Sequence, residues 1–293
     1  MSALDAAAPR IALVTCAAYA ELDVDDQLLI QPLRDLGAEV TIATWDDPAV
    51  AWGQFDAAVI RSTWDYTQHR PEFLQWAAAV SAVSRLLNPL PVITWSSDKI
   101  YLPDLAAADV PVVPTQFVKP GQSWTLPNGQ FVVKPSISAG SRDTLRLSDS
   151  AAGNLAVQAL HKHGRVAMIQ PYLTDVDVHA ETALVFLGGA FSHAVSKAAL
   201  LPLDAPAPVL ERGLFLAEKI AERTPRADQL AVAEAALQCA PSGWLYARVD
   251  LIDDEQGRPV VLELEMVEPS LFLGSHAGDR PAQTLAALIV DAV

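Results

Sequence analysis

The chain has 293 residues, 51% of them hydrophobic and 19% charged, which predicts two globular domains with room for a third small lobe. Acidic residues outnumber basic ones by 35 to 20, and the formal net charge of −15 disfavours binding to nucleic acid or to an anionic membrane surface. Cys16 and Cys239 are the only cysteines, which excludes a disulfide-stapled scaffold and a cysteine-rich zinc module.

The N-terminus and the apolar runs bear on where the protein resides. Residues 1–10 carry Asp5 and no basic flank ahead of an apolar run, which is unlike a secretory or transit signal. The longest apolar stretches, such as residues 11–20, are too short to span a bilayer. We therefore expect a soluble cytoplasmic protein whose two cysteines are buried or idle thiols.

Residues 1–95 alternate predicted strands with predicted helices. Short apolar runs predict buried strands at residues 11–15, 39–43 and 57–60. Leucines at helical spacing predict a helix over residues 26–36 that buries Leu28, Leu29, Leu33 and Leu36 on one face and stops at Gly37. A second helix is predicted over residues 71–85. This alternation is typical of a parallel α/β sheet.

Ligands of open α/β sheets bind beyond the carboxyl ends of the strands. The loops at residues 19–25 and 61–66 follow predicted strands and are therefore candidate walls of a site. In the second loop an aromatic-flanked carboxylate, Asp65, suits a substrate ammonium group, with helix capping and aromatic core packing as the alternative. Arg61 suits a substrate carboxylate or pairs with Asp65. Ser62 and Thr63 complete this predicted substrate set.

After residue 88 the pattern changes to strands joined by short turns, which indicates an α+β region. Gly188-Gly189 predicts the turn of a hairpin between residues 180–187 and 190–197. A second hairpin, residues 244–252 and 259–266, turns at residues 253–257, and further strands are predicted at 131–134 and 166–170. The Pro- and Asp-rich residues 201–211 predict a surface loop that orders over substrate.

Three carboxylates gather on the second hairpin. Glu263 and Glu265 are two residues apart on one strand and share a face, and a turn near Gln256 places Asp250 opposite Glu263 and Arg248 opposite Glu265. Carboxylates this close require a neutralising cation, and oxygen ligands beside phosphates are what Mg²⁺ prefers. Two interpretations stay open: a magnesium site, or an acidic sheet face with Arg248 as its counter-ion.

Several cations in this acidic chain are candidates for binding phosphate. Lys134 ends a predicted strand and precedes a loop rich in serine and glycine, residues 135–142, which is typical of loops that wrap phosphate oxygens. Lys99 is expected in the first turn of a helix capped by Ser96 or Ser97, with an ordinary surface lysine as the alternative. Lys197 and Arg212 are the remaining candidates. Cations beside an acidic cluster are what a nucleoside triphosphate with its metal requires.

The order of these motifs resembles the ATP-grasp superfamily. The resemblance runs from about residue 88 to the C-terminus and rests on Lys99, Phe131-Val132-Val133-Lys134-Pro135, Gln170-Pro171-Tyr172-Leu173, Glu181, Arg248-Val249-Asp250 and Glu263-Leu264-Glu265. Within the superfamily, Arg61-Ser62-Thr63-Trp64-Asp65-Tyr66, Asn88-Pro89, Asp98-Lys99-Ile100-Tyr101-Leu102 and Ser192-His193-Ala194-Val195-Ser196-Lys197 resemble the glutathione-synthetase/RimK-like branch, and more narrowly the cyclo-ligases that close O-ureido-D-serine to D-cycloserine.

The resemblance implies an α/β plus α+β architecture: a pre-ATP-grasp domain at residues 1–95, a first ATP-grasp lobe at 96–175 and a second at 176–293. It implies ATP and Mg²⁺ as cofactors. The nucleotide would be bound by Lys99, Lys134, Ser138, Gly140, Gln170, Tyr172, Leu173, Glu181 and Arg212. The metal ligands would be Asp250, Glu263 and Glu265. Arg248 and Lys197 would be catalytic, and Glu268 and Ser270 would join Arg61, Ser62, Thr63 and Asp65 at the substrate.

Two departures from the family pattern affect these assignments. Many relatives have Asn where Glu265 stands, so the metal site here is more anionic. The segment before Glu181 lacks the usual Gly-Glu, which leaves a ribose contact for Glu181 open.

The implied activity is an ATP-dependent ligase that turns a substrate carboxylate into an acyl phosphate, which an amine then attacks. For the cyclo-ligases the amine belongs to the same amino-acid-like molecule. Two alternatives stay open: an intermolecular ligase of amino acids or peptides, and a nucleotide-binding protein without turnover. The sequence is compatible with a homodimer.

Overall fold

The computed structural model describes residues 7–205, 210–212, 214, 219–275 and 280–293. Its N-terminal domain is a four-stranded sheet in the order β2-β1-β3-β4 with every neighbouring pair parallel, as the sequence predicts. The strands are β1 (Arg10–Thr15), β2 (Glu39–Thr44), β3 (Ala57–Ile60) and β4 (Arg85–Leu87).

Two predicted helices of this domain differ from expectation. The helix expected at residues 26–36 is a 3-10 turn, η2 (Asp26–Leu29), followed by α1 (Ile30–Asp35). Because a 3-10 turn has about three residues per turn, Leu28 rotates off the packed face and is 40% exposed, whereas Leu29 and Leu33 are buried. Leu36 follows the end of α1 and is 47% exposed. The second helix, α2 (Arg70–Ser81), ends before residue 85, because the chain turns back there to form β4.

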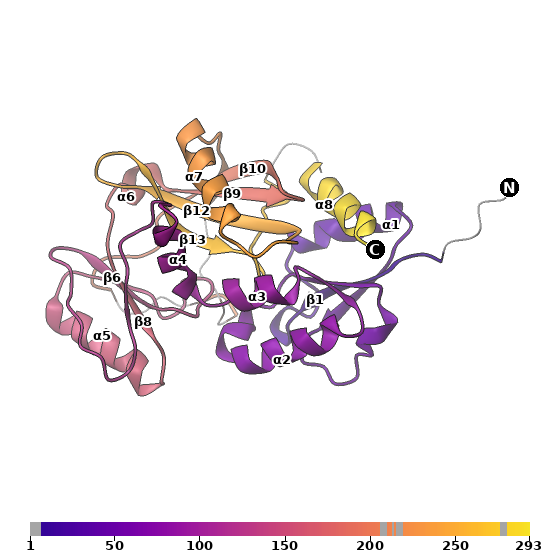
Figure 1. Cartoon of the computed structure of the whole chain (residues 1–293), viewed down its shortest axis with the longest axis horizontal. Coiled ribbons are helices and arrows are strands. Elements are labelled where there is room, and N and C mark those ends of the chain that lie inside the picture. Colours follow the sequence, from indigo (N-terminus) through magenta and orange to yellow (C-terminus); the bar gives the residue numbers. More distant parts are fainter. Residues whose placement is uncertain (1–6, 206–209, 213, 215–218, 276–279) are drawn as a thin grey trace.

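The region predicted as the first lobe contains a small antiparallel sheet covered by one helix. The strand order is β5-β8-β6-β7. These strands are β5 (Gln116–Val118), β6 (Phe131–Pro135), β7 (Leu145–Leu147) and β8 (Ala167–Pro171), and the covering helix is α5 (Ser150–Lys162). Val133, Ile169 and Val157 belong to the separate core of this lobe, which lies at the left of Figure 1.

The second lobe is a five-stranded antiparallel sheet in the order β11-β10-β9-β12-β13. Its strands are β9 (Glu181–Leu187), β10 (Ala190–Lys197), β11 (Ile220–Glu222), β12 (Tyr246–Asp253) and β13 (Pro259–Glu265), and both predicted hairpins are confirmed. Arg248 pairs with Glu265, and Asp250 with Glu263, in the expected register. The helices α3 (Leu90–Ser96), α4 (Leu102–Ala107) and α7 (Ala227–Gln238) pack on this sheet, while α6 (Val176–His179) precedes β9.

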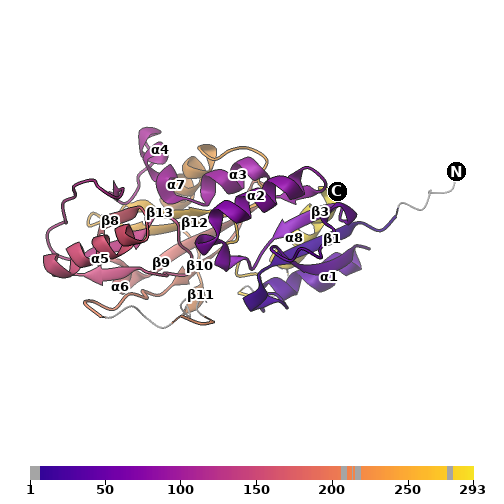
Figure 2. The same ribbon diagram turned by 90° about the horizontal axis from the view of Figure 1, so that it is seen from below.

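The N-terminal domain and the second lobe share one apolar core. Ile11 and Leu13 of β1 pack in the same cluster as Val185 of β9 and Leu285 of the last helix, α8 (Arg280–Asp291). Figures 1 and 2 show α8 returning beside α1, so the C-terminal segment covers the first domain rather than the second lobe alone. Likewise α4, predicted within the first lobe, packs against the second.

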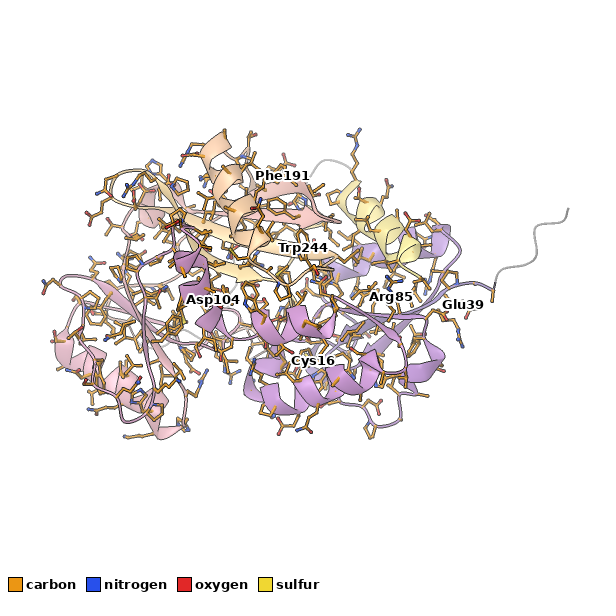
Figure 3. The ribbon with its side chains drawn as sticks, viewed as in Figure 1. Cys16, Glu39, Arg85, Asp104, Phe191 and Trp244 are labelled. Atoms are coloured by element: carbon orange, nitrogen blue, oxygen red, sulfur yellow. The ribbon has the colours of Figure 1, made fainter. Side chains whose placement is uncertain are left out.

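Cys16 and Cys239 are both free thiols, and Cys239 is half-buried. Cys16, labelled in Figure 3, is fully buried in the apolar cluster of the N-terminal domain, and burial raises the pKa of its thiol, consistent with a structural role. In the part of the chain that the structure describes, no helix is long and apolar enough to cross a membrane.

Candidate active site between the three parts of the chain

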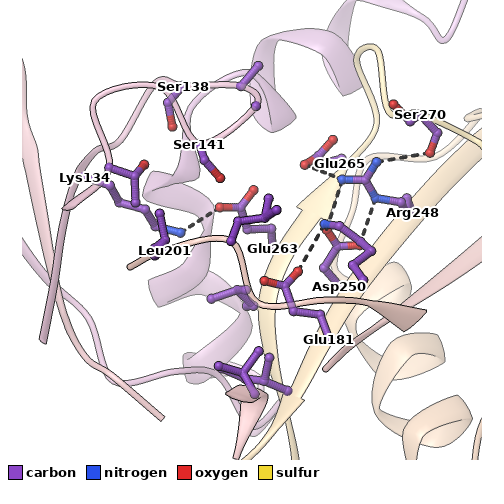
Figure 4. A pocket seen from close by; sticks show the side chains of 18 of the residues that line it. Lys134, Ser138, Ser141, Glu181, Leu201, Arg248, Asp250, Glu263, Glu265 and Ser270 are labelled. Atoms are coloured by element: carbon purple, nitrogen blue, oxygen red, sulfur yellow. Dashed lines mark hydrogen bonds and ion pairs between the residues drawn. The ribbon is translucent and has the colours of Figure 1, made fainter. Parts of the chain in front are cut away.

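A cavity of about 500 Å³ lies where the N-terminal domain and the two lobes meet. One end is lined by apolar side chains, the middle by ion pairs and the other end by carboxylates, and Figure 4 shows the middle. A cavity whose lining changes from apolar to charged side chains suits a ligand with an aromatic part, an anionic part and a small polar part.

Apolar side chains from both lobes line the first end of the cavity: Val113, Val132, Leu173, Ile252 and Leu262. Gln170, at the end of β8, is buried there and donates through Nε2 to Thr115 Oγ1 at 2.8 Å. The ring of Tyr172 carries the Arg146 guanidinium 3.6 Å from its centroid, so one face of the ring is covered. The segment that joins the lobes thus offers a flat, apolar slot that fits a purine.

Lysines and carboxylates alternate in the middle of the cavity. Glu263 lies 2.7 Å from Lys134 Nζ and 3.7 Å from Lys99 Nζ. Lys197 Nζ lies 2.9 Å from Asp250 and 3.1 Å from Glu181. Every lysine of this group is at most 9% exposed as a side chain, so the surface-lysine alternative for Lys99 is wrong.

Arg248 links the carboxylates of the two hairpin strands. Its Nε and Nη2 donate to Asp250 at 2.8 and 3.0 Å, and Nη2 also donates to Glu265 at 2.7 Å. Nη1 donates to the Ser270 carbonyl at 3.1 Å, as the dashed lines in Figure 4 show. The guanidinium therefore faces the point where the ion-paired middle of the cavity meets its acidic end.

The pairing separates the pKa values of the acidic residues. Burial acts to raise the pKa of Glu263, but Lys134 and Lys99 hold it well below its usual range, and Arg248 and Lys197 lower that of Asp250 in the same way. Burial raises the pKa of Glu265 to about 7, although Arg248 opposes the shift. Glu263 and Asp250 thus stay anionic across the physiological range, whereas Glu265 changes charge within it.

The loop after Lys134 approaches the cavity from the first lobe. Ser138 and Gly140 line the cavity, and Lys99 Nζ donates to the Ser138 carbonyl at 2.7 Å. The chain turns at Gly140 and Ser141, whose φ values are +58° and +61°. Lys99 begins a 3-10 turn capped by Asp98, so the predicted serine cap is wrong: Ser96 instead ends α3.

The second end of the cavity is acidic. Asp23 and Asp25 line it from the loop after β1, and Glu268 and Ser270 from the segment after β13. Glu268 is 5% exposed and forms no ion pair with any described residue, and burial together with nearby Glu265 raises its pKa to about 8. The loop at residues 19–25 is therefore confirmed as a cavity wall, although the individual acids on it are not part of the predicted set.

The structure places the four predicted substrate residues of the loop at 61–66 outside the described lining of the cavity. Arg61 is 0% exposed and donates to Asp26 at 2.8 Å and to the Pro269 carbonyl at 2.6 Å, so its carboxylate partner among the described residues is Asp26 and not Asp65. Ser62 and Thr63 are buried, and Asp65 accepts from Trp45 Nε1. From this loop, Trp64 is the residue found among those that line the described cavity.

Trp64 and Tyr66 pack in the aromatic core of the N-terminal domain, which is the alternative interpretation of the loop. Arg212 is also placed elsewhere: its guanidinium lies 4.3 Å from the Tyr19 ring centroid, and Nη1 donates to the Ala18 carbonyl. In the described structure Arg212 therefore contacts the N-terminal domain and is not among the residues that line the cavity.

The predicted metal ligands lie close together but are held by cations. Among the described residues, no group of three acidic, histidine or cysteine side chains is arranged to hold a metal ion by itself. Both oxygens of Asp250 accept from Arg248 or Lys197, and all three carboxylates are among the residues that line the cavity. Oxygen donors of this kind fit Mg²⁺ when phosphate oxygens complete the coordination shell.

The chain is similar to proteins of one biosynthetic family along nearly its whole length. Residues 11–88 match the family model of the D-cycloserine synthetase DcsG, N-terminal domain. The cycloserine biosynthesis protein DcsG of Streptomyces lavendulae is 37% identical over 296 residues, which cover 94% of this chain and 97% of the relative. The crystal structure of D-cycloserine synthetase DcsG superposes with a TM-score of 0.85 at 36% identity, covering 97% of this chain and 99% of that one.

This chain belongs to the DcsG family, and its fold is that of the ATP-grasp ligases. The D-alanine–D-alanine ligase from Bacillus anthracis, solved in complex with ATP, shares the fold with a TM-score of 0.67 at 14% identity, over 97% of both chains. The predicted superfamily, the mixed α/β fold and the prediction of a ligase enzyme are thereby confirmed.

Proposed function

We propose that this enzyme uses ATP to activate the carboxylate of O-ureido-D-serine as an acyl phosphate and then closes the molecule to D-cycloserine. The observation that carries the proposal is the match to DcsG over nearly the full length of both chains, because it includes the domain that forms the acidic end of the cavity.

The charges at the acidic end support an amino acid as the substrate. An α-ammonium group suits the carboxylates of Asp23 and Glu268, and a substrate carboxylate suits Arg248. Among the described lining residues of this end, Arg248 is the one cation, so the carboxylate of a second amino acid would lack a partner there. This distribution favours a nucleophile within the same molecule over an intermolecular ligase.

We assign the nucleotide to the remainder of the cavity. Gln170, Tyr172 and Leu173 would hold adenine, while Lys99 and Lys134 would meet phosphate oxygens together with the loop that carries Ser138 and Gly140. Glu181 already accepts from Lys197 at 3.1 Å, so it would reach the ribose only by sharing that pair.

The chemistry consists of two displacements. A carboxylate oxygen of the substrate attacks the γ-phosphorus, and the bond to the ADP oxygen breaks. Lys197 and Arg248 neutralise the charge on the transferred phosphoryl group. The nitrogen next to the side-chain oxygen then attacks the acyl carbon, phosphate leaves and a five-membered ring closes. Water afterwards removes the carbamoyl group as carbamic acid, which balances O-ureido-D-serine against D-cycloserine.

Glu263 and Glu265 would bind Mg²⁺ together with phosphate oxygens, and Asp250 would join them by sharing its ion pairs. The ion would screen the charge of the phosphates. Lys134 and Lys99 hold Glu263 ionised in the absence of metal, so this ligand would need no proton loss on binding.

The decisive experiment is the release of ADP by the purified enzyme with ATP, Mg²⁺ and O-ureido-D-serine, with D-cycloserine identified by mass spectrometry. The same assay with pairs of amino acids and with dipeptides tests the alternative of an intermolecular ligase. Product from O-ureido-D-serine alone supports the proposal. Turnover of an amino-acid pair, or tight binding of ATP without any turnover, would overturn it.

A matched pair of variants on one hairpin connects turnover to the site. We expect Glu263→Gln to lower kcat at least about a hundredfold, because it removes a charged ligand and leaves Lys134 without its counter-ion. Glu255→Gln makes the same chemical change in the exposed turn of that hairpin and should retain wild-type turnover.

A further inference from the structure

The phosphate-facing loop, residues 136–143, forms a thin wall between two cavities. Its apex, Ser138–Ser141, lines the ATP cavity. Other residues of the same loop, including Ile137 and Asp143, line a second cavity of about 770 Å³ that extends back to α5. Ala139 packs against the apolar cluster of the N-terminal domain, and hydrogen bonds from Lys99 and Arg165 hold other parts of the loop.

Two basic side chains hold this wall from opposite sides. Lys99 Nζ donates to the Ser138 carbonyl and lies 3.7 Å from Glu263, which lines the ATP cavity. Arg165, just before β8, reaches the loop from behind: Nη1 donates to Asp143 Oδ2 at 2.5 Å and Nη2 donates to the Ile137 carbonyl at 3.2 Å. One planar guanidinium therefore bridges the beginning and the end of the loop.

The conformation of the loop explains why such a bridge is needed. Ser141 and Asp143 have positive φ values of +61° and +54°, which cost energy for residues other than glycine. The Arg165–Asp143 pair is partly exposed, with 30% and 45% of the side chains accessible, so it adds little to global stability. We therefore expect the Arg165–Asp143 pair to stabilise the conformation of the loop rather than the whole fold.

We propose that Arg165 is a positioning residue for nucleotide binding, fixing Ser138–Ser141 in the shape that receives the phosphates of ATP. This inference rests on the ATP site of the proposed function but not on the identity of the substrate. It requires both arms of the guanidinium, since a lysine could reach only one end of the loop at a time.

The test compares nucleotide affinities by calorimetry, with Mg²⁺ and a non-hydrolysable ATP analogue, and with adenosine, which has no phosphates. We expect Arg165→Gln to weaken binding of the analogue about tenfold, equal to about 1.4 kcal/mol, and to leave adenosine binding unchanged. The affinity of Arg165→Lys for the analogue should lie between those of wild type and Arg165→Gln. Asp143→Asn should weaken binding of the analogue about threefold. Lys162→Gln, an exposed residue at the end of α5, is the matched control.

Hydrogen exchange adds a readout that a purely structural role would not give. Amides of residues 137–144 should exchange faster in Arg165→Gln, while the melting temperature stays within about 2 °C of wild type. The proposal is overturned if the analogue binds within twofold of wild type, or if adenosine binding falls by the same factor. If Arg165→Gln does not fold, Asp143→Asn decides by the same criteria.

These measurements need no turnover. A wild-type enzyme that fails to convert O-ureido-D-serine would therefore contradict the proposed function and leave the test of Arg165 intact.

Discussion

Glu268 shows how a single buried carboxyl changes the behaviour of the site. Its burial raises the pKa to about 8 from an ordinary value of 4.5, so the folded protein retains a proton that the unfolded chain loses above pH 4.5. Stability without ligands should therefore fall as the pH rises from 4.5 to 8 and then stay level. A substrate ammonium group beside Glu268 would lower this pKa and favour the charged form.

Glu268→Gln removes that titration. We expect the variant to unfold at the same temperature as wild type at pH 5, and to be more stable by about 4 kcal/mol above pH 8, since the amide carries no charge to bury. Thermal unfolding between pH 5 and 9, without nucleotide or metal, measures the difference. A difference that stays constant across this range would contradict the assigned pKa.

Arg248 is the second residue whose role depends on geometry as well as charge. Its guanidinium contacts Asp250, Glu265 and the Ser270 carbonyl at once, an arrangement that the single ammonium of lysine cannot reproduce. We expect Arg248→Lys to lower kcat at least about a hundredfold while adenosine still binds with wild-type affinity. Single-turnover kinetics measures the loss of kcat, and calorimetry measures the affinity for adenosine. A loss of adenosine binding would instead indicate that the substitution has collapsed the site.

At the scale of elements, the loop after β10 fastens the second lobe to the first. Asp204 accepts from Ser148 through both the amide, at 2.8 Å, and the hydroxyl, at 2.6 Å, and its own amide donates to the Arg146 carbonyl. Leu200 and Leu201 of this loop line the cavity, so the described part of the predicted 201–211 loop covers the site. Residues 206–209 lie outside the described residues.

Asp204→Ala should loosen this connection. We expect the KM for ATP to rise about threefold to tenfold and the ratio of ADP to cyclised product to exceed one, because water reaches the acyl phosphate before the ring closes. Parallel assays of ADP and product give the ratio. Asp291→Ala, an exposed residue on α8, serves as the control, and an unchanged ratio in Asp204→Ala would show that the loop does not exclude water.

At the scale of the whole molecule, the N-terminal domain and the second lobe depend on each other for stability. The Tyr246 hydroxyl of β12 lies 2.7 Å from the Ile60 carbonyl of β3 and 3.1 Å from the Val267 carbonyl. The Asn88 side chain donates to the Tyr246 and Met266 carbonyls at 2.8 and 2.9 Å. These buried bonds lie between the two parts that share the apolar core.

Tyr246→Phe tests whether the two parts unfold together. We expect a loss of about 1–3 kcal/mol, because the carbonyls at the contact lose a buried donor. Tryptophan fluorescence, to which Trp45, Trp52, Trp64 and Trp76 of the N-terminal domain contribute, should report the same midpoint as circular dichroism, which follows all parts. Separate midpoints for these two signals would show independent domains.

The sequence alone predicted those features that depend on local pattern. Continuous apolar runs gave the parallel strands, and Gly188-Gly189 and the 253–257 turn gave the two hairpins. For the second hairpin the predicted pairs were also correct, although the pairing shifts by one residue between Asp250 and Leu251. The register then placed Arg248 beside Glu265 and Asp250 beside Glu263. The ordered motifs gave the superfamily, which the comparisons confirmed.

Only the tertiary structure decided which polar groups face the cavity. Arg61 and Asp65 occupy a loop at the expected sheet edge, yet Asp26 and Trp45 bind them inside the domain, and Arg212 lies on Tyr19. The strand pattern places a residue at an edge of the sheet. A buried charge requires a polar partner, and that partner comes from a distant segment that the local pattern does not reveal. The acidic end of the cavity likewise forms only because the loop after β1 meets the segment after β13 across the shared core.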